Sequence, residues 1–203
     1  MLIGMIFNGI RNGIFSHETN FDNRHIKNDA AMKKFVSHSR GLGLRIVLTQ
    51  GTYDMAHIGH ARYFEAAKKY GDILIVGVDS DEKVRARKGP DRPVVPEAER
   101  LEMVCHLRPV DAVYLKQYKA PKWSLIKIVR PDVLIATKET YGTEQLRELK
   151  KYCGKVVVLN PQATTSTSAK LRRLQIGMAS KFEKTLMPKV MEAIAAALKE
   201  VKG

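Results

Sequence analysis

The sequence has little cysteine, no long apolar run and few aromatic residues. Its two cysteines, Cys105 and Cys153, lack the spacing of a metal site and are too few for a disulfide framework. No stretch approaches the roughly 18 to 20 consecutive apolar residues that a membrane-spanning helix needs. Residues 1–15 are mildly apolar but lack the basic start of a signal peptide. We therefore expect a cytoplasmic globular protein that does not bind a membrane.

Positive charge is what the sequence has in excess, with 35 Lys and Arg against 21 Asp and Glu and a formal net charge of +14. Residues 44–174 hold 24 of the basic and 15 of the acidic residues, so most of the excess belongs to the body of the chain. This distribution suits a cleft that binds phosphate groups. Nucleic acid is not the expected partner, because an aromatic content of 7% offers no evident platform for stacking bases.

Predicted strands and helices alternate along residues 44–174, and 203 residues are too few for two full-sized domains. The strands are predicted at 44–50, 73–79, 110–115, 132–136 and 155–159, and the helices at 58–70, 96–107, 124–129, 143–152 and 169–174. This alternation is typical of a doubly wound parallel α/β sheet. Residues 83–96, which are basic and contain three prolines, are predicted to form a mobile loop.

Two extensions are expected to flank this domain. Residues 1–43 form an N-terminal extension with a helix near 28–39, and residues 175–203 form a C-terminal helical extension. Within the latter, residues 187–201 have the periodicity of an amphipathic helix.

A motif with two histidines, GTYDMAHIGH at residues 51–60, directly follows the first predicted strand. Sheets of this class bind ligands at the carboxyl ends of their strands. His57 and His60 are three residues apart in the first turn of a helix, and Gly59 between them leaves room for a ligand. A helix N-terminus and imidazole N–H groups both favour phosphate. The alternative is that His57 is a packed capping residue and His60 a surface residue.

These residues resemble the GxxDxxHxGH signature of the cytidylyltransferase-like nucleotidyltransferases, and the similarity extends over about residues 33–174. Further matches occur, in order, at Asp81, Lys83, Arg85, Lys88, Gly89, Arg92, Pro93, Pro96, Arg100, Val110 and Asp111. Within the family the sequence is most similar to bacterial heptose-1-phosphate adenylyltransferases, followed by cytidylyltransferases for ethanolamine phosphate and glycerol phosphate and by archaeal FAD synthetases. The resemblance implies a Rossmann-like nucleotidyltransferase fold and a homodimer.

The resemblance also implies a role for particular residues. His57, His60 and Lys88 are the expected catalytic residues, because in-line attack on phosphorus needs positioning and cations more than a protein nucleophile. The remaining residues expected to bind nucleotide or phosphate are Gly51, Thr52, Tyr53, Asp54, Gly59, Arg85, Arg100, Ser166, Thr167 and Ser168. Asp79 and Lys138 are expected to bind the acceptor. Mg²⁺ is the expected cofactor, held mainly by the phosphates of the nucleotide.

Each of these assignments has a plainer alternative. The basic residues of 85–88 could be an ordinary solvated loop, and Arg100 could form a surface ion pair with a neighbouring glutamate. We expect Asp54 to cap the histidine helix in preference to reaching Mg²⁺ through water. Residues 166–168 could simply cap the helix that follows them.

Two segments depart from the patterns of the relatives and leave the substrates open. Residues 160–168 lack the arginine that cytidylyltransferases carry in an RTxGISTT phrase, which disfavours CTP. Residues 136–141 keep only the tyrosine of a KGGDY-like segment, with Lys138 as a candidate replacement for its lysine.

The leading hypothesis is transfer of AMP from ATP to a sugar phosphate, with release of pyrophosphate. A cytidylyltransferase acting on glycerol-3-phosphate or an amino-alcohol phosphate is the second. A non-catalytic protein that binds nucleotide or nucleic acid is the third.

Overall fold

The computed structural model describes residues 20–137, 141–160, 162–163 and 167–201. The chain forms two compact units, which divide between Thr164 and Thr165. Helix α9 (Thr167–Lys181) spans residue 175, at which the C-terminal extension is expected to begin.

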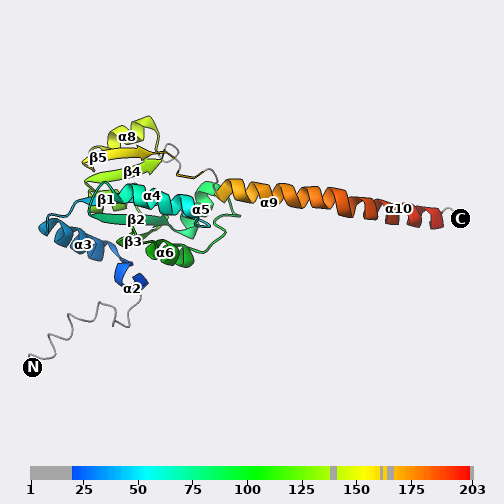
Figure 1. Ribbon diagram of the computed structural model, residues 1–203, viewed down its shortest axis with the longest axis horizontal. Helices are drawn as coiled ribbons and strands as arrows, with labels where there is room; N and C mark the ends of the chain where they lie inside the picture. The colour runs from blue at the N-terminus through cyan, green and yellow to red at the C-terminus, as the bar shows by residue number, and fades with distance from the viewer. Residues whose placement is uncertain (1–19, 138–140, 161, 164–166, 202–203) are drawn as a thin grey trace, which may run out of the picture. The chain divides into compact units, whose positions relative to one another are not determined.

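The first unit is built on a five-stranded parallel sheet with the strand order β3-β2-β1-β4-β5 (Figure 1). The strands are β1 (Ile46–Gly51), β2 (Ile73–Asp79), β3 (Ala112–Lys116), β4 (Val133–Thr137) and β5 (Lys155–Leu159). Continuous runs of β-branched residues form the central strands because both faces of a parallel sheet are covered. The predicted doubly wound class is confirmed. The strand order reverses beside β1, where such sheets bind their ligands.

Helices cover both faces of this sheet, and each face has its own hydrophobic core. The helices of the first unit are α2 (Asn20–Arg24), α3 (Asp29–Gly41), α4 (Ile58–Lys68), α5 (Asp81–Lys88), α6 (Glu97–Cys105), α7 (Ser124–Val129) and α8 (Thr143–Leu149). Buried residues of α4 and α6 share one core with alternate strand residues such as Val47 and Val76. Buried residues of α3, α7 and α8 share the other core with Ile46 and Ile75.

Helix α5 corrects the sequence prediction of a mobile loop for residues 83–88, whereas residues 89–96 lie outside any helix or strand. The Ser80 side chain accepts a hydrogen bond from the Lys83 amide and caps the helix, whose first turn is acidic and whose last turn is basic. Both charge placements favour a helix through its dipole. Val84 anchors the helix because it is fully buried.

The second unit consists of helix α9, a π-helical turn over Phe182–Leu186 and helix α10 (Met187–Val201). Helix α10 has the bounds that its amphipathic pattern predicts. Among the residues that the structure describes, no helix is long and apolar enough to cross a membrane.

Candidate active site

The two histidines lie at the N-terminus of α4, and each accepts a hydrogen bond from the backbone. His57 is the N-cap of the helix, and its Nδ1 accepts from the Gly59 amide at 3.1 Å. The His60 Nδ1 accepts from the His57 amide at 3.2 Å. The capping role that we considered as an alternative for His57 is therefore present, and it is compatible with a second role for the ring.

These hydrogen bonds decide which nitrogen of each ring carries the proton. A neutral imidazole has one donor and one acceptor nitrogen, so a ring that accepts at Nδ1 is protonated at Nε2. The ring centroids of His57 and His60 are 4.1 Å apart, with an angle of 42° between the ring planes. Two rings this close together can each offer an Nε2–H donor to the same phosphate group.

Two glycines of the motif leave room for aromatic rings. A Cβ atom at Gly59 would lie 2.8 Å from Cε1 of His57, and one at Gly51 would lie 2.9 Å from the Tyr53 ring. Tyr53 is buried and packs edge-on against His60, with centroids 5.6 Å apart. Tyr53 therefore packs against His60 and helps to orient it, while the expected contact of Tyr53 with the nucleotide stays a prediction.

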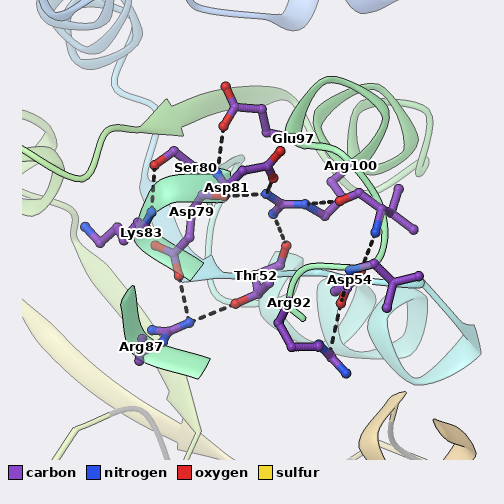
Figure 2. Close-up of polar contacts among 12 residues, drawn as sticks. Thr52, Asp54, Asp79, Ser80, Asp81, Lys83, Arg87, Arg92, Glu97 and Arg100 are labelled. Atoms are coloured by element: carbon purple, nitrogen blue, oxygen red, sulfur yellow. Dashed lines mark hydrogen bonds and ion pairs between the residues drawn. The ribbon is translucent and has the colours of Figure 1, made fainter. Parts of the chain in front are cut away.

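Asp54 does not cap the histidine helix, contrary to our expectation, because His57 occupies that position. Its buried carboxylate accepts hydrogen bonds from the amides of Val94 and Val95 and forms an ion pair with Arg92 at 2.9 Å (Figure 2). A carboxylate with several charge-assisted partners holds them in place strongly. Asp54 therefore fixes the segment that follows α5 against the histidine motif.

Arg100 is also buried, and it is a structural residue in this fold. Its side chain is 1% exposed and makes four hydrogen bonds, three of them to carbonyl oxygens and one to a carboxylate (Figure 2). The acceptors are the Val95, Thr52 and Asp79 carbonyls and the Asp81 carboxylate. This finding corrects the alternative of a surface ion pair with a neighbouring glutamate, because Arg100 is buried and pairs with Asp81. The expected phosphate contact of Arg100 stays a prediction.

Asp79 ends β2 and is held between two cations. Its carboxylate, 1% exposed, contacts Lys116 Nζ at 3.0 Å through Oδ1 and Arg87 Nη2 at 2.9 Å through Oδ2. Arg87 Nη2 also donates to Thr52 Oγ1 at 2.8 Å. Thr52 is buried, and its hydroxyl accepts a hydrogen bond from Arg87 while its carbonyl accepts one from Arg100. Sequence reasoning missed Lys116, whose importance depends on its registry with Asp79 in the sheet.

Lys88 and Arg85 lie on α5, and both are exposed. Desolvation lowers the pKa of Lys88, and the neighbouring charges of Arg87 and Arg92 lower it further, while Asp54 and Asp79 raise it. Lys88 therefore lies within the same group of charges as the two buried carboxylates. An anion at this place would stabilise its protonated form.

Four expected site residues cannot be located in full. Lys138 and Ser166 lie outside the described residues, and Thr167 and Ser168 are described only as part of the α9 backbone. In the part of the chain that is described, no group of three or more His, Cys, Asp or Glu side chains is arranged to hold a metal ion.

Comparison with known proteins adds to this geometry. The model of the cytidylyltransferase-like family matches residues 48–192. The bifunctional protein HldE of Aliarcobacter butzleri is 34% identical over 164 residues, which are 78% of this chain and 33% of that protein. The HldE protein of Methylobacillus flagellatus is 41% identical over 142 residues, which are 68% of this chain and 29% of that protein. The chain thus spans about a third of the length of these relatives.

Solved structures also resemble the chain. A lipopolysaccharide core biosynthesis protein from Thermoplasma volcanium has 28% identity and a TM-score of 0.51, covering 59% of this chain and 98% of that one. The pantoate-beta-alanine ligase of Francisella tularensis has 15% identity and a TM-score of 0.57, covering 80% of this chain and 78% of the ligase. This second likeness concerns the fold alone.

Proposed function

The chain belongs to the cytidylyltransferase-like family of nucleotidyltransferases, and from this premise we propose that it moves AMP from ATP to a sugar phosphate of the heptose-1-phosphate type. A phosphate oxygen of the acceptor attacks the α-phosphorus of ATP and forms the new P–O bond. The bond from the α-phosphorus to the oxygen that bridges to the β-phosphate breaks, and pyrophosphate leaves. No covalent intermediate with the protein is needed.

The histidine pair is the observation that carries this proposal. Charge grows on the phosphate oxygens as the α-phosphorus is attacked, and fixed donors at that place stabilise it without reorganising. Nδ1 of His57 and of His60 is held by the backbone, so both Nε2–H donors are positioned before the substrate arrives. Gly59 lets the His57 ring pack closely against the first turn of the helix, because a side chain at this position would collide with the ring.

The cations of α5 complete the proposed phosphate site. Lys88 is the third catalytic residue in this proposal, and Arg85 binds a phosphate of the nucleotide. Mg²⁺ carried by the nucleotide phosphates supplies further charge neutralisation when it is bound. Gly51, at the end of β1, remains a proposed nucleotide-binding residue, which would contact the nucleotide through its backbone because the Tyr53 ring fills the space at its Cβ position.

Support for the sugar-phosphate acceptor comes from the relatives. The chain is similar to HldE proteins and to a lipopolysaccharide core biosynthesis protein, at identities between 28% and 41%. Lys138 and residues 166–168 remain proposed ligands of acceptor and triphosphate. A homodimer and a cytoplasmic location are part of the same proposal.

The test is pyrophosphate release in the presence of Mg²⁺, with ATP and CTP each offered against sugar 1-phosphates, glycerol-3-phosphate and phosphoethanolamine. We expect turnover with ATP and a sugar 1-phosphate, and its loss in His60→Ala. Turnover with CTP alone would mean that the protein is a cytidylyltransferase. Binding of ATP without pyrophosphate release from any pair would contradict it.

A further inference from the structure

We propose that Arg87 and Lys116, both positioned by Asp79, form a subsite that binds the phosphate group of the acceptor. This inference rests on the proposed function, because it assigns the second substrate of that reaction to a place in the fold. The subsite lies at the carboxyl ends of β2 and β3, and Figure 2 shows Arg87 between Asp79 and Thr52.

The first argument is the balance of charge around Asp79. Both oxygens of its carboxylate are in contact with a cation, Oδ1 with Lys116 and Oδ2 with Arg87. The buried Asp79 carboxylate therefore contacts two cationic side chains, and the three side chains together carry a net charge of +1. With both oxygens engaged, Asp79 is a positioning residue, which revises the expected direct contact between Asp79 and the acceptor.

Further cations surround this group. Burial lowers the pKa of Lys116, and the charges of Lys83 and Arg87 lower it as well, while Asp79 raises it. Lys88 is also within electrostatic range of Asp79 and Arg87. Cations gathered at this density repel one another, and a phosphate monoester, which carries about −1.5 to −2 charges at neutral pH, relieves that repulsion.

The second argument is access. The Arg87 side chain is 54% exposed, and both of its hydrogen bonds leave from Nη2. A guanidinium has five N–H donors in a planar fork, so an arginine held at one edge can present the others to a phosphate. Lys116 is only 16% exposed, which places its charge at the inner wall of the same subsite.

The third argument is that the subsite and the histidines lie on different faces of the sheet. The Lys116 side chain lies over Gly77 of β2, on the face of the sheet that α7 covers. A Cβ atom at Gly77 would lie 2.7 Å from Cδ of Lys116 and 2.6 Å from Cδ2 of Leu125 in α7. The histidines instead begin α4, which packs on the opposite face. Nucleotidyl transfer needs two phosphate groups brought together, and both groups of donors belong to the carboxyl edge of the parallel strands β1, β2 and β3. This geometry favours the acceptor over the nucleotide as the source of the phosphate.

Neutral polar groups adjoin the subsite. A Cβ atom at Gly77 would also lie 3.2 Å from Cγ of Gln50, so Gln50 and Lys116 are neighbours above this glycine. The Gln50 amide donates to the Tyr141 hydroxyl at 3.0 Å. An acceptor whose phosphate contacts Arg87 and Lys116 would place its body near amide and phenol groups, which suits a compound rich in hydroxyl groups.

The experiment compares Arg87→Met and Lys116→Met with Lys119→Met, which removes an exposed lysine outside the cluster. Removing a charged donor from a phosphate contact should weaken binding by about tenfold to a hundredfold. We therefore expect the KM of the acceptor to rise by that factor in the first two variants, with the KM of ATP unchanged. Lys119→Met should resemble the wild type. An equal rise in the KM of ATP would assign the subsite to the nucleotide and overturn the proposal.

A titration that needs no turnover separates this inference from the proposed function. Inorganic phosphate is titrated by calorimetry into protein saturated with a non-hydrolysable ATP analogue. Weaker binding of phosphate in Arg87→Met, with the analogue still bound as in the wild type, supports the subsite even if no acceptor reacts. Equal phosphate affinity in the wild type and Arg87→Met, or no phosphate binding by the wild type, would overturn it. Arg87 is 54% exposed, and Asp79 keeps Lys116 as a partner in Arg87→Met, so we expect this variant to fold.

Discussion

His57 has two roles in this account, and a pair of substitutions separates them. Its Nδ1 caps α4 by accepting from the Gly59 amide, and its Nε2 donates to phosphate. Asparagine is among the best N-cap residues, so His57→Asn should keep the cap and remove only the distant donor. His57→Ala removes both. Loss of a cap costs about 0.5–2 kcal/mol, and loss of one donor to the transition state lowers kcat by about 10²–10³.

Both variants should therefore lose about 10²–10³ in kcat, measured as pyrophosphate release, and only His57→Ala should lose stability. For a chain of this size, 1 kcal/mol corresponds to about 2–4 °C in Tm, which a thermal unfolding scan resolves. A His57→Asn enzyme that keeps wild-type kcat would refute the role of Nε2. Equal losses of Tm in the two variants would refute the capping role.

Three further predictions concern residues around the histidines. Arg100→Met leaves the Asp81 carboxylate and three carbonyl groups without their partner, so the free energy of unfolding in urea should fall by about 3–5 kcal/mol; a loss below about 1 kcal/mol would contradict the buried framework. Because desolvation lowers the pKa of Lys88, kcat/KM should decline with rising pH already below the ordinary lysine pKa, as Lys88 loses its proton. Lys88→Arg should abolish this decline, and identical pH profiles of variant and wild type would exclude Lys88 as its source. Gly59→Ala places a methyl group 2.8 Å from the His57 ring and should lower kcat while the far-ultraviolet spectrum remains that of the wild type; unchanged kcat would mean that the ring position is not critical.

Local patterns in the sequence predict most of this fold. The strands Ile73–Asp79 and Lys155–Leu159 and the helices Ser124–Val129 and Met187–Val201 have the predicted bounds. Each has a strong periodic or continuous apolar pattern that tertiary contacts reinforce. Helix α5 was missed because the prolines after it outweighed the cap at Ser80 and the acidic residues that follow it.

The site is less predictable, because the roles of its charged residues depend on partners distant in the sequence. The histidine pair is recognisable because the motif, its strand and its helix are contiguous. Asp54 instead binds amides 40 and 41 residues away, and Arg100 binds a carbonyl 48 residues away. The contact of Lys116 with Asp79 requires the registry of β3 on β2. No local pattern distinguishes such residues from solvated ones.

The most direct test of nucleotidyl transfer follows the α-phosphate of ATP. The protein is incubated with Mg²⁺, a sugar 1-phosphate and ATP that is radiolabelled at either the α- or the γ-phosphate. We predict that the α-label appears in the sugar product and the γ-label in pyrophosphate, and that both appear about 10²–10³ times more slowly in His57→Asn. Transfer of the γ-label to the sugar phosphate would mean phosphoryl transfer and would contradict the account.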